Sequence, residues 1–304
     1  MKKFTLLLAA ALFCGGMSAF AQDDEDITIS AAQDAAGNPL FTFDDDMMYY
    51  VIELDDETKA AKLKTGQYVY IGPDDDEGRP LYVWQQSGNN TIAFRKTNGE
   101  KNSFGVPDAF KACTALPFGW TGMGYNVKAG SPIDLSGITD EFTFHFAVKT
   151  KTTQSVDFYL TDGSAANGGK GRTAHLVLGS KKYGTDEAVG DFPRDDKWYN
   201  VDVPMTYLED NFGLSFKNAK EYQDRNLLSV LIGTSNGNRL DYDAVFFYGP
   251  KGSTAGVKEV NVTNGNVPVS VYTMDGKRVT EQYAVANKGV YIVKQGNKTK
   301  KVAF

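Results

Sequence analysis

The sequence predicts an all-β protein, with a β-sandwich as its main body and a small β-domain at the C-terminus. Short segments rich in Val, Ile, Tyr and Phe recur along the chain, and clusters of Gly, Asn and Asp separate them. No long stretch has the periodicity of an amphipathic helix, which favours a sandwich over a mixed fold. A composition of 41% hydrophobic and 12% aromatic residues is sufficient for a packed core.

The clearest expected strand covers residues 142–150, which read FTFHFAVKT. Every second residue is apolar, so one face should pack on a core and the other, which carries His145, should be wetter. Short helices are expected over 56–64 and 107–112, because Asp56 can cap the first and Pro107 can open the second. The expected strands of the main body are 49–54, 67–71, 81–85, 91–95, 142–150, 155–161, 174–178, 199–203, 227–233 and 242–248.

The N-terminus has the three parts of a secretory signal peptide. Two lysines follow Met1, residues 4–13 are apolar, and Ala19-Phe20-Ala21 is a small-x-small cleavage site. We therefore expect cleavage after Ala21, a mature chain that starts at Gln22, and no transmembrane segment once the leader is removed. An uncleaved anchor is disfavoured because a glycine pair ends the apolar run short of the ~20 residues that a membrane span needs.

Charge and cysteine content exclude several classes of protein. The net charge is −6, and loss of the two leader lysines makes it about −8. Such an acidic chain lacks the basic surface that nucleic acid or an anionic membrane would require. Cys14 follows the bulky Phe13, which disfavours a lipoprotein signal, and Cys113 is then the only cysteine left, so no disulfide framework is expected. Residues 22–46 begin with an acidic run and are expected to form a flexible lead-in.

Two segments of the main body resemble a known family. Residues 196–204 (DKWYNVDVP) are similar to the W-x-x-V-x-V-P strand of galactose-binding-like jelly rolls, and residues 240–248 (LDYDAVFFY) are similar to their closing strand. The resemblance extends over residues 47–250. It implies a jelly-roll β-sandwich, which is the fold of many carbohydrate-binding modules, and it makes carbohydrate the first ligand class to expect.

The same resemblance implies a structural calcium ion beside the closing strand. Asp241 and Asp243 alternate with Tyr242, so both should point to one side of that strand. Glu53 on the first strand would be the further ligand. Carboxylate oxygens suit calcium, but a solvated acidic edge is the alternative.

A linker over residues 251–256 and a basic tail over 257–304 follow the sandwich. From residue 251 to the end the chain has nine Lys or Arg and three Asp or Glu. The tail resembles the C-terminal sorting domain of the type IX secretion system, which implies the type IX translocon as a partner and delivery to the cell surface or beyond. A small structural β-domain is the alternative. The residues that carry the resemblance include Tyr272, Asp275, Gly276, Gly289, Tyr291, Lys300 and Lys301.

No catalytic residue can be nominated from the sequence. Only His145 and His175 are present, and neither has a Cys or a second His at metal-ligand spacing. The chain has no G-x-S-x-G motif. Residues 163–171 (GSAANGGKG) depart from a phosphate-binding loop, because a glycine separates the second motif glycine from the lysine.

Aromatic residues beside glycines and polar loops form the candidate ligand site. Trp120 and Tyr125 lie in the glycine-rich segment FGWTGMGY, and Tyr82 and Trp84 lie in a strand beside a polar loop. Flat aromatic rings can stack on sugar rings, although filling the core is the alternative role. We expect a non-catalytic carbohydrate-binding protein. A structural or adhesive surface protein without a small-molecule ligand is the alternative, and a glycan-active hydrolase is the third hypothesis.

Overall fold

The structure is a computed structural model that describes residues 26–74, 78–84, 99–114, 120–179, 187–233, 237–252, 269–273, 277–279, 290–295 and 298–303. The signal peptide with its cleavage site at Ala21 and Gln22, the expected strand at 91–95, and most of the linker lie outside these residues. So do Asp275, Gly276 and Gly289 of the tail. In the part of the chain that the structure describes, no helix is long and apolar enough to span a membrane.

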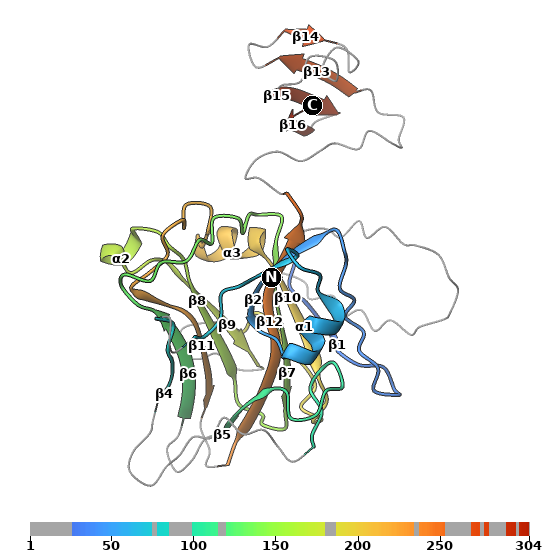
Figure 1. Cartoon of the computed structure of the whole chain (residues 1–304), viewed down its shortest axis with the longest axis vertical. Helices are drawn as coiled ribbons and strands as arrows, with labels where there is room; N and C mark the ends of the chain where they lie inside the picture. Colours follow the sequence, from blue (N-terminus) through green and yellow to red (C-terminus); the bar gives the residue numbers. More distant parts are fainter. Residues whose placement is uncertain are drawn as a thin grey trace.

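Two sheets form the sandwich, which confirms the predicted all-β fold class (Figure 1). The seven-stranded sheet has the order β1-β10-β7-β12-β2-β3, and β5 pairs with one end of β12. Its strands are β1 (Thr28–Ala31), β2 (Met47–Glu53), β3 (Tyr68–Tyr70), β5 (Lys111–Thr114), β7 (Thr143–Thr150), β10 (Tyr199–Pro204) and β12 (Arg239–Pro250).

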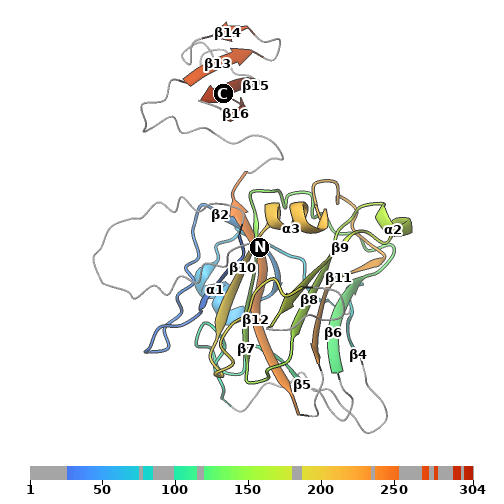
Figure 2. The same ribbon diagram turned by 180° about the vertical axis from the view of Figure 1, so that it is seen from behind.

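The five-stranded sheet is antiparallel and has the order β4-β6-β11-β8-β9. Its strands are β4 (Leu81–Trp84), β6 (Trp120–Val127), β8 (Val156–Thr161), β9 (Thr173–Leu178) and β11 (Arg225–Gly233). Three short helices accompany the sheets: α1 (Asp56–Lys62), α2 (Ala166–Gly169) and α3 (Met205–Phe212). Figure 2 shows α2 and α3 at one end of the sandwich and β5 at the other.

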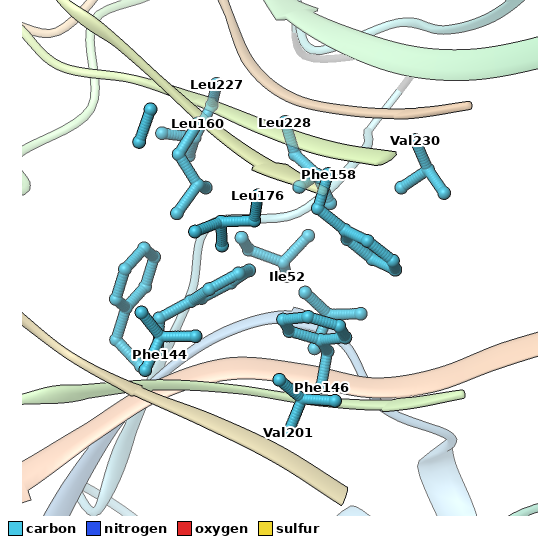
Figure 3. Close-up of a cluster of buried hydrophobic side chains, with 14 of the residues drawn as sticks. Ile52, Phe144, Phe146, Phe158, Leu160, Leu176, Val201, Leu227, Leu228 and Val230 are labelled. Atoms are coloured by element: carbon cyan, nitrogen blue, oxygen red, sulfur yellow. The ribbon is translucent and has the colours of Figure 1, made fainter. Parts of the chain in front are cut away.

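The main core lies between the two sheets. Alternate residues of β7 and β8 point into it, and Phe144, Phe146 and Phe158 are fully buried there. The rings of Phe146 and Phe158 stack across the two sheets with centroids 4.0 Å apart. Figure 3 shows this arrangement, with Phe144, Phe146 and Val201 rising from one sheet toward Phe158, Leu160 and Leu228 of the other.

The far face of β7 is also buried, which corrects the prediction of a wetter face. His145 and Ala147 are 0% exposed. A second apolar cluster covers this side of the seven-stranded sheet, and it contains Phe246 from β12 together with Phe41 and Phe104 from the segments laid over the sheet. The sequence period showed that this face differs from the core face, but it could not show that a third layer covers it.

The first part of this covering layer is the segment that the sequence predicted to be a flexible lead-in. Within residues 26–46, β1 pairs with β10 in register, with Ile29 opposite Val201. Phe41 packs its ring against those of Phe246 and Tyr248. The described part of the lead-in is therefore a strand and an apolar cover.

The second part of the covering layer comes from residues 99–114, where the sequence predicted a short helix over 107–112. The structure instead places Lys111–Thr114 in β5, paired with β12. Pro107 forms an isolated bridge with Lys101, so the proline closes a turn and does not open a helix. The predicted helix over 56–64 is present as α1, but Asp55 caps it by accepting a hydrogen bond from Thr58.

The C-terminal tail contains a four-stranded antiparallel sheet in the order β14-β13-β15-β16, as the sequence predicted for a small β-domain. Its strands are β13 (Val269–Thr273), β14 (Arg278–Val279), β15 (Val290–Gln295) and β16 (Lys298–Ala303). Tyr291 on β15 is buried and pairs with Val302, whereas Tyr272 is half-buried. Lys300 and Lys301 lie on β16.

Candidate functional site

The outer face of the five-stranded sheet carries one row of residues that crosses all five strands. Backbone register places Tyr82 opposite Gly124, Gly124 opposite Ser229, Ser229 opposite Tyr159, and Tyr159 opposite His175. Because neighbouring strands lie ~4.8 Å apart, the row is roughly 19 Å long. The strand neighbours of these residues, such as Phe158, Leu176 and Met123, are buried in the core, so the row faces outward.

Two rings of this row, on neighbouring strands, stack face to face on each other. The Tyr159 and His175 rings stack with centroids 4.0 Å apart and an interplanar angle of 12°. The Nε2 atom of His175 lies 3.3 Å from the Asp157 carboxylate, which is almost fully buried and fixes the imidazole in place. The His175 side chain is 11% exposed and Tyr159 is half-buried, so each keeps part of its surface at the solvent.

Glycines occupy the centre of the row on β6. Gly124 lies between Tyr82 and Ser229, and Gly122 lies between Trp84 on β4 and Leu231 on β11. A glycine in a strand interior leaves room for another group to approach the backbone closely. Tyr82 at the β4 edge is half-buried, and this burial raises the pKa of its hydroxyl. Gly122, Gly124 and Ser229 are themselves buried, so the partly exposed positions of the row are Tyr82, Tyr159 and His175.

The structure brings together three of the four predicted ligand-binding residues. Tyr82 and Trp84 are two residues apart on β4, and Trp120 pairs with Gly233 at the start of β6, so all three hold positions on the outer face. Tyr125 does not belong with them. It is 1% exposed on the core side, and its hydroxyl donates a hydrogen bond to the Ile71 carbonyl, so the prediction for Tyr125 is wrong.

Sequence reasoning missed Tyr159, His175 and Asp157. A usable signal existed, because Val156–Thr161 alternates a core residue with a polar or aromatic one, and Thr173–Leu178 does so as far as Leu176. What the sequence could not supply was the register that places Tyr159 beside His175. The stacking partner of His175 comes from another strand, so the residues next to His175 in the sequence do not indicate it.

The three residues predicted to hold calcium do not converge on a common point. Lys149 Nζ lies 3.0 Å from one Asp241 oxygen, and Arg239 Nε lies 2.6 Å from the other, so basic groups already neutralise this carboxylate. Glu53 pairs with Lys111 at 3.4 Å. No group of three potential metal ligands occurs among the described residues. These side chains therefore do not fit a calcium ion.

The environment of Asp243 differs from that of Asp241. A bulge in β12, with Ala244 at a φ of 55°, turns both Asp243 and Ala244 toward the covering layer. Asp243 accepts hydrogen bonds from the hydroxyl and the backbone N–H of Ser103. Complete burial raises the pKa of Asp243 to about 7, with the nearby Asp55 and Glu53 adding to the effect.

Cys113 is a buried free thiol on β5, and burial raises its pKa to about 12. A thiol in this state is not a nucleophile near neutral pH.

Comparison with protein families gives one match. A family model described as carbohydrate binding domain 30 matches residues 43–272, which include β2 to β12 and extend into β13. Searches of curated proteins and of solved structures returned no significant match.

Proposed function

The chain belongs to the carbohydrate binding domain 30 family, and from that premise we propose that it is an exported, non-catalytic protein that binds a glycan on the outer face of its five-stranded sheet. The family match supports a carbohydrate-binding role for three quarters of the chain. The observation that supports this location is the row of Tyr82, Gly124, Ser229, Tyr159 and His175 on a face that the core does not use.

The chemistry of this face suits a sugar chain. Aromatic rings bury the apolar faces of sugar rings, and the partly exposed Tyr82, Tyr159 and His175 carry polar groups that can hydrogen-bond with sugar hydroxyls. The row is roughly 19 Å long and crosses all five strands, so an extended chain of several sugar units fits it better than a single small ligand.

Alanine substitution on this face tests the proposed site. Replacing an aromatic residue that anchors a ligand typically costs ~2 kcal/mol, about 30-fold in Kd. We expect Trp120→Ala and Tyr82→Ala to weaken binding to soluble polysaccharides by about this factor in affinity electrophoresis, with an unchanged melting temperature. A matched control is Tyr68→Ala, because Tyr68 is a 37% exposed aromatic on the other sheet.

These variants distinguish a loss of glycan binding from a loss of folding. If Trp120→Ala lowers stability by the ~3–5 kcal/mol expected of a core aromatic, without a selective loss of binding, then Trp120 is not part of the binding face. If Tyr68→Ala weakens binding as much as Tyr82→Ala does, the proposed location is wrong.

The proposal of export rests on the N-terminal leader and on the basic tail. The leader would take the chain across the inner membrane. The tail resembles a type IX sorting domain, and its β-sheet offers edge strands that a receptor strand could pair with. The sandwich has its own core, so a chain without residues 255–304 should still fold.

Cell fractionation tests the proposed sorting role. We expect the chain without residues 255–304 to stay folded in the periplasm of a native-type host, and a passenger fused to residues 251–304 to reach the surface. Normal amounts of the truncated chain outside the cell would show that the tail is a structural domain.

A further inference from the structure

A second cavity lies away from the aromatic face, against the seven-stranded sheet. It has a volume of about 360 Å³ and lies where β7 ends and β12 begins. This volume falls within the roughly 300–1,000 Å³ typical of small-molecule sites. Lys149, Arg239, Glu100 and Asp241 form its floor, and Lys151 and Asp196 form its rim.

The floor is a closed network of two cations and two carboxylates. Lys149 Nζ lies 3.0 Å from Asp241 and 3.1 Å from Glu100. Arg239 donates to both Asp241 oxygens, at 2.6 and 3.0 Å, and to Glu100 at 2.9 Å. Each carboxylate therefore bridges the same two basic groups, which fixes the positions of all four side chains.

Packing beneath the network makes it rigid. The Lys149 ammonium lies 5.2 Å from the Phe110 ring centroid and 5.3 Å from that of Trp198. Both rings are buried, so they support the floor but offer no stacking surface to a ligand. Thr150 ties the two strands together by donating a hydrogen bond to the Arg239 carbonyl at 2.6 Å.

A purely structural role explains this arrangement poorly. Desolvation offsets most of the attraction in the buried Lys149–Asp241 pair, and solvent screens the pair of Arg239 with Glu100, whose side chains are 34% and 44% exposed. A polar cavity bounded by fixed charges is, in contrast, what a binding site for a polar small molecule requires.

The donors and acceptors of the cavity define the ligand chemistry. Three basic groups and three carboxylates line it, so its net charge is close to zero. An anion would face Glu100, Asp196 and Asp241, and a cation would face the basic groups. A hydroxyl group both donates and accepts hydrogen bonds, so a polyhydroxylated neutral molecule can use both kinds of partner.

We propose that this cavity is a second binding site that takes a single neutral sugar unit through its hydroxyl groups. The inference rests on the proposed carbohydrate-binding function and adds a site of a different kind. The aromatic face stacks on a chain, whereas the cavity holds one unit by hydrogen bonds alone. The unit is either a free monosaccharide or the end of a chain.

Titration of the ¹⁵N-labelled full chain tests the site. The probes are glucose, galactose, mannose and xylose, the disaccharide cellobiose, and glucuronate and sulfate as anionic comparisons. We expect at least one neutral sugar to shift the backbone amide signals of Thr150, Thr152 and Asn238. Binding of free monosaccharides would identify a free-sugar site, and binding of cellobiose alone would identify a chain end.

Rim variants show whether the cavity residues make the contact. Asp196→Asn and Lys151→Gln should each weaken binding about tenfold, the effect of losing one hydrogen bond to a charged group. Asp196 has a φ of 67°, and asparagine tolerates this conformation, so the variant should fold. Lys217→Gln is the matched control, since Lys217 forms ion pairs with Glu209 of α3 and with Asp140.

Three results would overturn this inference: no shift with any neutral sugar, shifts with glucuronate or sulfate only, or equal weakening by Lys217→Gln. The Tyr159→Ala variant distinguishes the two sites. It should bind polysaccharide more weakly, while the signals of the cavity residues should respond to a neutral sugar as they do in the unmodified chain. If the chain binds polysaccharide but no neutral sugar shifts the signals of the cavity residues, only the proposal of a second site is wrong. If polysaccharide binding is also absent, the proposed function fails.

Discussion

The outer faces of the two sheets show how similar sequence patterns lead to different roles. Each face carries a histidine hydrogen-bonded to an aspartate: His145 with Asp202 at 2.8 Å on the seven-stranded sheet, and His175 with Asp157 at 3.3 Å on the five-stranded sheet. His145 is 0% exposed beneath Phe41, whereas the His175 side chain is 11% exposed. A third layer turns the face around His145 into a second core, while Tyr159 and His175 on the other face stay partly exposed.

Phe246→Ala should have the largest effect, because Phe246 lies at the centre of the covered face. Its ring packs against Phe41, Phe43, Tyr49 and His145. We expect a loss of ~3–5 kcal/mol in the free energy of unfolding, measured by urea denaturation. A loss below 1 kcal/mol would mean that the covering layer does not form a core.

Phe41→Ala should have the next largest effect, because it removes the ring that seals the covering layer over His145. Phe41 is partly buried, so we expect a loss of about 2–3 kcal/mol. Glycan binding should not change, since the aromatic face is on the other sheet. A loss of glycan affinity in a variant that remains folded would contradict the assignment of the two faces.

Burial of Asp243 should make the free energy of unfolding depend on pH. Its pKa is about 7 in the folded chain and ~3.9 in an unfolded one, so the folded state binds the extra proton between these values. Stability is therefore greatest below about pH 4 for this group and falls as the pH rises to 7, by at most ~1.4 kcal/mol per unit. Asp243→Asn should remove this fall in urea denaturation from pH 5 to 8. An identical pH dependence in both proteins would contradict the burial of Asp243.

Tyr159→Ala should have the smallest effect on stability and a clear effect on binding. It removes a half-buried ring that stacks on His175, so we expect a loss of ~1 kcal/mol in stability. Polysaccharide affinity should fall about tenfold. Isothermal titration calorimetry would measure this loss, and a variant with full affinity would place the ligand elsewhere.

Most of the strands could be predicted from the sequence because their residues alternate or are β-branched. The Phe142–Thr150 segment and the Val156–Thr161 segment are examples. Three strands could not be recognised. β1 is short and polar, β5 follows a proline that suggested a helix, and β6 contains glycines that lower its strand propensity.

The candidate site could be predicted only in part. The glycine and aromatic content pointed to Trp120, Tyr82 and Trp84, but the same criterion also selected Tyr125. A one-residue step along β6 moves a side chain from the outer face to the core, and local composition does not reveal that step. The stacking of Tyr159 on His175 depends on the register between strands. The ion pairs of Asp241 with Lys149 and Arg239 also depend on contacts that the sequence does not show.

Hydrogen–deuterium exchange of the full chain with and without a bound glycan is the most direct test of the binding face. The chain should first be screened on a glycan array to identify a ligand. We then expect added protection in β4, β6, β11, β8 and β9, centred on the row from Tyr82 to His175, and unchanged exchange in β1 and β10. Protection confined to the seven-stranded sheet, with none in the five-stranded sheet, would contradict the proposed location of the glycan site.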